Sequence, residues 1–243
     1  IVTTFSDNGY KEYGHWFVES VHKFIDDNIN VFFYTDNVDI KLKSNITNQR
    51  LEKSIPDLTK FKNKNKDRSP SNFMFDAVRF SHKSYCLYHA ATTKDVDLLC
   101  WLDTDTEIIS KITPNYIQSF LPKGKFVAYL GREGTYTETG FLVFDMKHKF
   151  ASEYFERFKN YYDTNKIYEL EAQLDCHVFD AVRIEMEKEG KISNQNISPP
   201  GITKTHFDQA LNGYIAHYKG AKKTVRDKHY GKALKRKEKL KIV

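Results

Sequence analysis

Two aspartates, Asp103 and Asp105, follow the most apolar stretch of the chain, residues 97–102. That stretch is predicted to be the central strand of a sheet, and ligands of open α/β sheets bind beyond the carboxyl ends of the strands. Residues two apart in an extended segment face the same side. The two carboxylates could therefore hold a hard divalent cation, Mn²⁺ or Mg²⁺. The alternative is an ordinary Asp-Thr-Asp turn that ends a strand.

A second group of residues that could do chemistry lies far downstream, at H-x-x-G-x-x-K spacing. It consists of His217, Gly220 and Lys223. It offers an imidazole that can bind a metal, a glycine that admits close approach and an ammonium for phosphate. The alternative is a surface histidine beside a basic segment.

The elements that must position these residues follow from the hydrophobic pattern. Strands are predicted at residues 1–5, 31–34, 97–102, 125–130 and 140–144, and helices at 10–25, 73–91, 147–162 and 169–189. The polar stretch 37–70 is expected to form loop and weak helix. This alternation predicts a three-layer α/β fold with a mostly parallel central sheet flanked by helices.

Composition excludes several classes of protein. With 243 residues, 40% apolar and 14% aromatic, the chain is not disordered, and no stretch reaches the roughly 20 apolar residues of a membrane span. Three cysteines are too few for a disulfide framework. We expect Cys86, Cys100 and Cys176 to be buried thiols, and a cytoplasmic location.

Charge is concentrated at the C-terminal end, where residues 219–243 hold eleven Lys or Arg and two acidic residues. The sequence therefore predicts a catalytic domain over 1–223 and a basic tail over 224–243. Such a tail could contact anionic lipid, nucleic acid or an acidic partner, and a peripheral membrane contact is one expectation. The simpler interpretation is a solvated end.

Residues 101–108 resemble the hydrophobic-Leu-Asp-x-Asp segment of GT-A (Rossmann-like) glycosyltransferases. Residues 217–223 resemble the H-x-x-G-x-x-K segment of the glycogenin-like retaining enzymes, which include bacterial lipopolysaccharide galactosyltransferases. The resemblance implies an Mn²⁺ or Mg²⁺ site of Asp103, Asp105 and His217. It also places Thr104, Gly220 and Lys223 on the donor diphosphate side. Thr224 and Val225 stand where the family has Pro-Trp.

The first strand and the loop after it resemble the part of these enzymes that holds uracil and ribose. The residues concerned are Phe5, Ser6, Asp7, Asn8 and Tyr10. A carboxylate or an amide can bind base and sugar, and Tyr10 can stack on the base. The alternative is a simple turn.

Arg79 and Lys83, four apart and thus on one helix face, resemble the helix that faces the donor. Asp76 could orient Arg79, and the alternative is a surface helix with ion pairs. Glu138 occupies the position of an Asn that lines the sugar site. Gln173 and Asp175 resemble a stretch near the reacting centre, so Arg79, Gln173 and Asp175 are the implied catalytic residues. For that stretch the alternative is the polar start of helix 169–189.

These features predict a metal-dependent glycosyltransferase. It would move a sugar from a nucleoside diphosphate donor, a UDP-sugar, to a hydroxyl of a glycan, glycolipid or protein, with retention. A sugar nucleotidyltransferase is the alternative enzyme, although residues 6–9 lack the Gly-rich basic loop typical of that class. A module that binds nucleic acid or an anionic surface through the tail is a third possibility, but no specific nucleic-acid partner is expected because no recognition motif is present.

Overall fold

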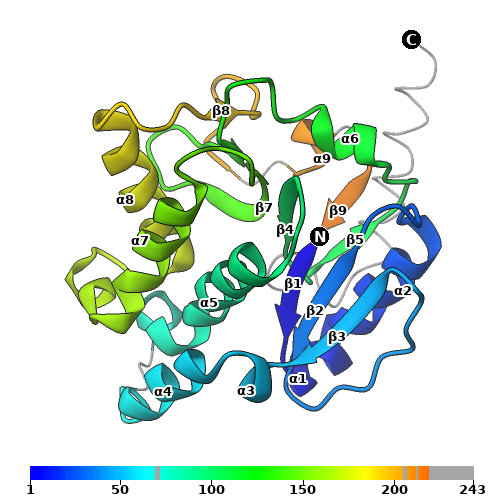
Figure 1. Ribbon diagram of the computed structural model, residues 1–243, viewed down its shortest axis with the longest axis horizontal. Coiled ribbons are helices and arrows are strands. Elements are labelled where there is room, and N and C mark those ends of the chain that lie inside the picture. Colours follow the sequence, from blue (N-terminus) through cyan, green and yellow to red (C-terminus); the bar gives the residue numbers. More distant parts are fainter. Residues whose placement is uncertain (69–71, 205–206, 212, 219–243) are drawn as a thin grey trace.

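The computed structural model describes residues 1–68, 72–204, 207–211 and 213–218. A seven-stranded sheet in the order β3-β2-β1-β4-β7-β6-β8 forms the centre of the molecule, and β5 and β9 form a separate pair (Figure 1). The strands are β1 (Val2–Phe5), β2 (Val31–Thr35), β3 (Ile46–Arg50), β4 (Leu98–Leu102), β5 (Thr106–Ile108), β6 (Val127–Leu130), β7 (Glu138–Asp145), β8 (Gln195–Asn196) and β9 (Ile215–His217).

Strand direction decides where a ligand can bind. β1 runs parallel to β2 and β4, β2 to β3, and β6 to β8. β7 is antiparallel to both of its neighbours, β4 and β6. The other six strands of this sheet therefore share one direction, and their C-terminal ends lie along one side, which we call the carboxyl edge. The predicted mostly parallel α/β fold is confirmed, with β4 in the middle.

Helices cover both faces of the sheet. α5, α7 and α8 lie together on one face, and α2 lies on the other (Figure 1). The helices are α1 (Asp7–Gly9), α2 (His15–Phe24), α3 (Leu51–Ser54), α4 (Pro56–Lys64), α5 (Ala77–Thr93), α6 (Pro114–Gln118), α7 (Ala151–Asp163), α8 (Asp175–Lys188) and α9 (Phe207–Ala210). Short π or 3-10 turns lie at η1 (Tyr10–Gly14), η2 (Phe73–Phe75) and η3 (Lys166–Glu169).

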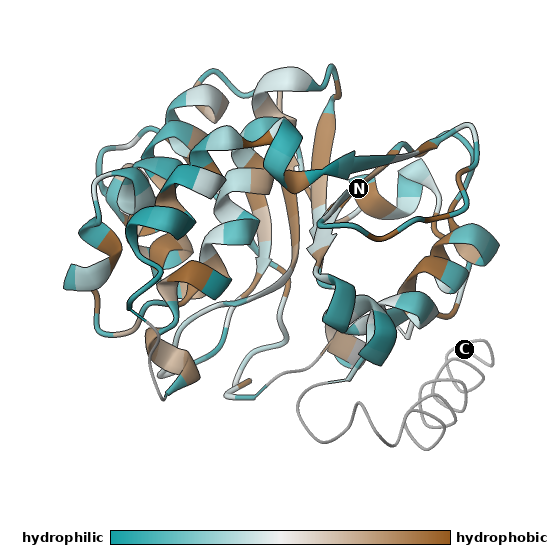
Figure 2. Ribbon diagram, turned by 90° about the horizontal axis from the view of Figure 1, so that it is seen from below, coloured by the Kyte–Doolittle hydropathy of each residue, from teal (hydrophilic) through white to brown (hydrophobic). Residues whose placement is uncertain are grey.

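Alternating side chains of the central strand fill two separate cores. Leu99 and Trp101 pack with α5, α7 and α8, whereas Cys100 and Leu102 pack with α2. This is the period of two that a strand buried on both faces requires. Figure 2 shows the hydrophobic strands enclosed between helices with hydrophilic outer faces. Asp103 continues the series after Trp101, so it points to the α5 and α8 side.

Two predicted segments need correction. Residues 37–70, expected to form loop and weak helix, do contain the helices α3 and α4, but they also contain a strand, β3, that was not predicted. β3 reads Ile-Thr-Asn-Gln-Arg and lies at the sheet edge, so it lacks the apolar alternation of a half-buried strand. The predicted helix 169–189 begins only at Asp175, after η3 and an extended Leu174.

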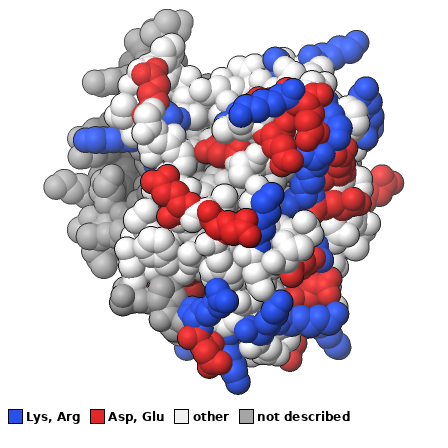
Figure 3. Space-filling model, turned by 90° about the vertical axis from the view of Figure 1, so that its left-hand side faces the viewer, with Lys and Arg blue, Asp and Glu red and all other residues white. Residues whose placement is uncertain are grey.

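The predicted burial of the three cysteines is confirmed, and none forms a disulfide. Burial raises the pKa of all three thiols, that of Cys100 to about 12. None of the helices in the described ranges is long and apolar enough to cross a membrane. On the side of the molecule that carries α7 and α8, acidic and basic side chains are interspersed (Figure 3).

Candidate active site

A cavity of about 640 Å³ opens at the carboxyl edge, where β1, β4, α5 and the start of α8 meet. Nine of the residues predicted from the sequence line it: Phe5, Ser6, Asn8, Arg79, Lys83, Asp103, Thr104, Asp105 and Asp175. Residues 100 or more positions apart are thus brought together at the side of the sheet where ligands of α/β proteins bind.

Asp103 is fixed from three directions. The indole Nε1 of Trp101 donates to its Oδ1 at 2.6 Å, and Lys83 Nζ lies 3.1 Å from the same oxygen. Its backbone N–H donates to the carbonyl of Gly140 at 2.9 Å. A Cβ on Gly140 would lie 3.1 Å from Asp103 Oδ2 and 2.7 Å from the ring of Phe207, so glycine is needed there.

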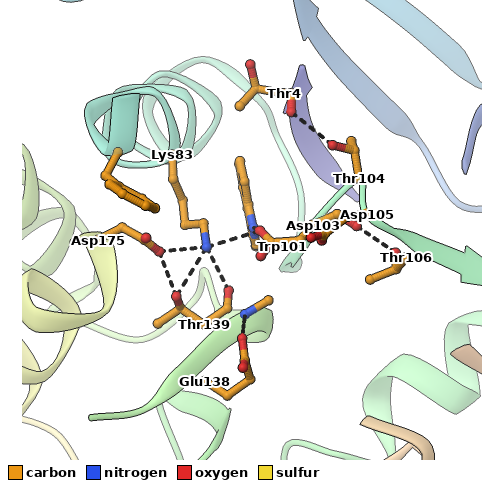
Figure 4. Close-up of polar contacts among 12 residues, drawn as sticks. Thr4, Lys83, Trp101, Asp103, Thr104, Asp105, Thr106, Glu138, Thr139 and Asp175 are labelled. Atoms are coloured by element: carbon orange, nitrogen blue, oxygen red, sulfur yellow. Dashed lines mark hydrogen bonds and ion pairs between the residues drawn. The ribbon is translucent and has the colours of Figure 1, made fainter. Parts of the chain in front are cut away.

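Lys83 joins Asp103 to Asp175 across the cavity (Figure 4). Its Nζ lies 2.6 Å from Asp175 Oδ2 and donates to the carbonyl and hydroxyl of Thr139 at 3.0 and 3.2 Å. The hydroxyl of Thr139 donates in turn to Asp175 at 2.6 Å. Burial alone would lower the pKa of Lys83, but the two carboxylates outweigh it and raise that pKa. Lys83 is therefore a fixed cation between two anions.

The pKa of Asp103 is raised, because burial and the negative charges of Asp105 and Asp175 outweigh the opposing effect of Lys83. An added cation would relieve that repulsion.

His217 reaches the site through the small β5–β9 pair, in which it is the register partner of Thr106. Its Nε2 lies 3.2 Å from Asp105 Oδ1. The hydroxyl of Thr106 donates to the carbonyl of Asp103 and closes a turn. Asp103 and Asp105 therefore do not lie on one extended segment as expected: Asp103 points to Lys83, and Asp105 to His217.

The Asp105–His217 pair has the spacing of two metal ligands. A cation with bonds of about 2.1 Å at right angles separates neighbouring donor atoms by about 3 Å, close to the 3.2 Å found here. The other ring nitrogen of His217, Nδ1, is buried and has no hydrogen-bond partner within the part of the chain that the structure describes. Within the described residues, however, no three His, Cys, Asp or Glu side chains already form a metal cluster. Asp103 could complete one through Oδ2, or by exchanging the contact of Oδ1 with Lys83.

The loop after β1 forms the other end of the cavity. Ser6 caps α1 by accepting from the N–H of Gly9 at 3.1 Å. Tyr10 does not line the cavity; its ring stacks on Phe5 at 5.6 Å. The carboxylate of Asp7 also points elsewhere and accepts from the N–H of Asn37.

Three more residues named in the sequence analysis make contacts other than those expected. Asp76 caps α5 by accepting from the backbone N–H of Arg79, rather than holding its guanidinium. Glu138 is buried, 3.8 Å from Arg132, and accepts from the N–H of Gly140. Gln173 lies off the cavity, and its N–H donates to the carbonyl of Met74. Gly220, Lys223 and the basic tail lie outside the described residues.

Sequence reasoning gave no role to seven cavity residues: Thr4, Gly9, Glu12, Tyr13, Phe80, His82 and Trp101. Tyr13 is one of the apolar residues whose spacing predicts helix 10–25, but in the structure it belongs to the π turn η1 and lines the cavity. The position of Trp101 two residues before Asp103 was the available signal for its role.

Comparison with solved structures identifies the architecture. The sequence matches no protein-family model and none of the curated proteins. Among solved structures, the WbbM bifunctional glycosyltransferase superposes on 90% of this chain with a TM-score of 0.51 and 13% identity. Mouse xyloside xylosyltransferase 1 superposes on 80% with a TM-score of 0.51 and 8% identity. The chain has the GT-A glycosyltransferase fold. It covers 83% of the xylosyltransferase chain and 45% of the WbbM chain, so it spans less than half of the latter.

Proposed function

We propose that this chain is a metal-dependent glycosyltransferase that moves a sugar from a UDP-sugar to a hydroxyl of a glycan, glycolipid or protein. The observation that carries the proposal is the charge of the cavity in a chain with the GT-A fold. Its described lining holds two permanent cations, Arg79 and Lys83, and five carboxyl groups: Glu12, Asp76, Asp103, Asp105 and Asp175. Such a cavity repels a nucleoside diphosphate unless a divalent cation enters with it.

The residues that would hold Mn²⁺ or Mg²⁺ are Asp103, Asp105 and His217. The cation would offset the charge that develops on the departing diphosphate. Retention of configuration is proposed on the resemblance of residues 217–223 to the glycogenin-like enzymes.

Different residues of the chain would contact different parts of the donor. Ser6 and Asn8, which line the cavity beyond β1 together with Tyr13, would bind ribose and base. Arg79 supplies a cation for the phosphates. Asp175 is held by Lys83 and Thr139 at the inner end of the cavity, where its carboxylate can accept hydrogen bonds from sugar hydroxyls. Because the Asp175 carboxylate is held in place before the donor arrives, it needs little reorganisation on binding.

Thermal unfolding with nucleoside diphosphates, with and without Mn²⁺, tests the donor half of this proposal. Stabilisation by UDP that requires Mn²⁺ is the expected result, worth about 2.7 kcal/mol at 100 times the dissociation constant. Absence of a shift with every nucleotide and metal would contradict it. Pyrophosphate release from a nucleoside triphosphate and a sugar phosphate would instead indicate the nucleotidyltransferase.

Asp105→Asn should abolish the Mn²⁺-dependent shift and UDP-sugar turnover, because it removes one of the proposed metal ligands. The melting temperature without ligand should stay near that of the wild type, since Asp105 is partly exposed. Asp97→Asn is the matched control: its carboxylate is 77% exposed and precedes β4, at the opposite edge of the sheet. Near-normal activity of Asp105→Asn would refute the assignment of the site.

A further inference from the structure

A second cleft lies farther along the carboxyl edge, beyond β7. It has a volume of about 480 Å³, within the range of small-molecule sites. The segments that follow β6 and β8 and one side of α8 form its walls. The residues of its lining that matter here are Arg132, Glu133, Thr137, Asp180, Arg183 and Ile202. We call it the β6–β8 cleft.

The walls of this cleft are held in place by internal hydrogen bonds. Asp180 accepts from the N–H and hydroxyl of Thr137 at 2.8 and 2.6 Å, and pairs with Arg183 at 3.0 Å. Arg132 donates through Nε to the carbonyl of Tyr136 at 2.8 Å. A binding site whose side chains are already fixed loses less conformational entropy when a ligand binds.

Charge balance indicates what kind of ligand fits. The ionisable groups of the lining are two cations, Arg132 and Arg183, and two anions, Glu133 and Asp180. The cleft therefore has no net charge to attract a phosphate or a nucleotide, unlike the cavity beside β4. Interleaved donors and acceptors suit hydroxyl groups, which can both donate and accept. Apolar surfaces of Pro200 and Ile202 can pack against the C–H faces of sugar rings.

The cleft and the active-site cavity share two elements. On β7 and the residue before it, Thr139 contacts Asp175 in the cavity, and Thr137 contacts Asp180 in the cleft. The two aspartates are five residues apart on α8, which corresponds to about 7.5 Å along the helix axis. A ligand in the cleft would therefore lie close to Asp175 in the active-site cavity.

We propose that the β6–β8 cleft binds the non-reacting sugars of a neutral oligosaccharide acceptor, so that its terminal hydroxyl reaches the donor cavity. This inference rests on the proposed glycosyl transfer. It names the acceptor class, a neutral glycan of more than one sugar, which the donor site does not specify.

The test uses immobilised glycans that are neutral, carboxylated or phosphorylated, probed with the labelled protein. Thr135→Trp places a large ring at the exposed mouth of the cleft, and Pro200→Trp does so from the opposite wall. Thr93→Trp is the matched control, since Thr93 is exposed at the end of α5 farthest from the cavity. We expect the wild type and the control to bind neutral glycans, and each cleft variant to bind at least tenfold more weakly.

The response to UDP and Mn²⁺ separates this inference from the proposed function. All four proteins should show the same nucleotide-dependent rise in melting temperature, because none of the changes lies in the donor cavity. Wild-type protein that binds no glycan, that prefers charged glycans, or whose binding survives both cleft variants would overturn the acceptor assignment while the donor assignment stands. Glycan binding at the cleft without any nucleotide response would instead refute the proposed transferase.

Discussion

At the scale of single residues, the central feature is one lysine shared by two carboxylates. Lys83 is 9% exposed, and its partners Asp103 and Asp175 are 28% and 7% exposed. Removing these charged groups from water costs free energy, and the attraction between them offsets this desolvation penalty only while all three groups are present. Loss of the cation leaves two neighbouring negative charges without compensation.

Lys83→Met should lower the free energy of unfolding by about 3 kcal/mol, because an uncompensated buried charge is strongly destabilising. Lys159→Met is the matched control. Lys159 also bridges two aspartates, Asp57 and Asp163, but these are 44% and 37% exposed, so a loss of about 1 kcal/mol or less is expected. Urea unfolding measures the free energy of unfolding of both variants. Equal losses would show that the Lys83 ion pairs contribute no more to stability than the exposed ion pairs of Lys159.

At the scale of elements, long elements with a clear pattern could be predicted and short ones could not. β4 is a continuous apolar run and α5 is a long amphipathic segment, and both were predicted close to their actual bounds. β5 and β9 have three residues each, too few for a period to show. Their pairing is what brings His217 to Asp105, so the sequence could suggest that contact only through the resemblance to a known family.

The same limit applies to the site. Asp103, Lys83 and Asp175 were predicted as functional residues, but Asp105 does not share the direction of Asp103, because a turn closed by Thr106 follows β4. Tyr10 was predicted to contact the donor, whereas the ring of Tyr10 is stacked on Phe5. Local pattern identifies residue types, and packing between distant elements decides which of them face the cavity.

Gly140→Ala tests the packing of β7 against the site. The added Cβ would overlap the ring of Phe207 and press on Asp103, so we expect a loss of about 1–3 kcal/mol in stability. Affinity for UDP with Mn²⁺ should fall as well, because Asp103 is displaced. Calorimetry of unfolding and titration with UDP measure the two effects. Unchanged stability and affinity would show that β7 can move aside without consequence.

At the scale of the whole molecule, the two hydrophobic cores lie on opposite faces of one sheet and share its strands. Phe155 belongs to the core on the α7 side, and Phe17 to the core on the α2 side. Strands such as β4 contribute side chains to both cores. Unfolding of one core would therefore expose the other to solvent. The described structure should therefore unfold as one cooperative unit.

Phe155→Leu and Phe17→Leu should each lower the melting temperature of a single transition, and neither should split it into two. Differential scanning calorimetry, compared with circular dichroism, tests this expectation. Two resolved transitions in either variant would mean that the two sides of the sheet unfold independently.

The burial of every cysteine has a practical consequence for spectroscopy. The thiolate is the species that reacts with maleimide or disulfide reagents, and Cys86, Cys100 and Cys176 are buried with raised pKa values. The native protein should thus take up almost no label at pH 7. Thr135→Cys would then carry a single fluorophore or spin label at the mouth of the β6–β8 cleft, with no native cysteine replaced, and report directly on what enters it.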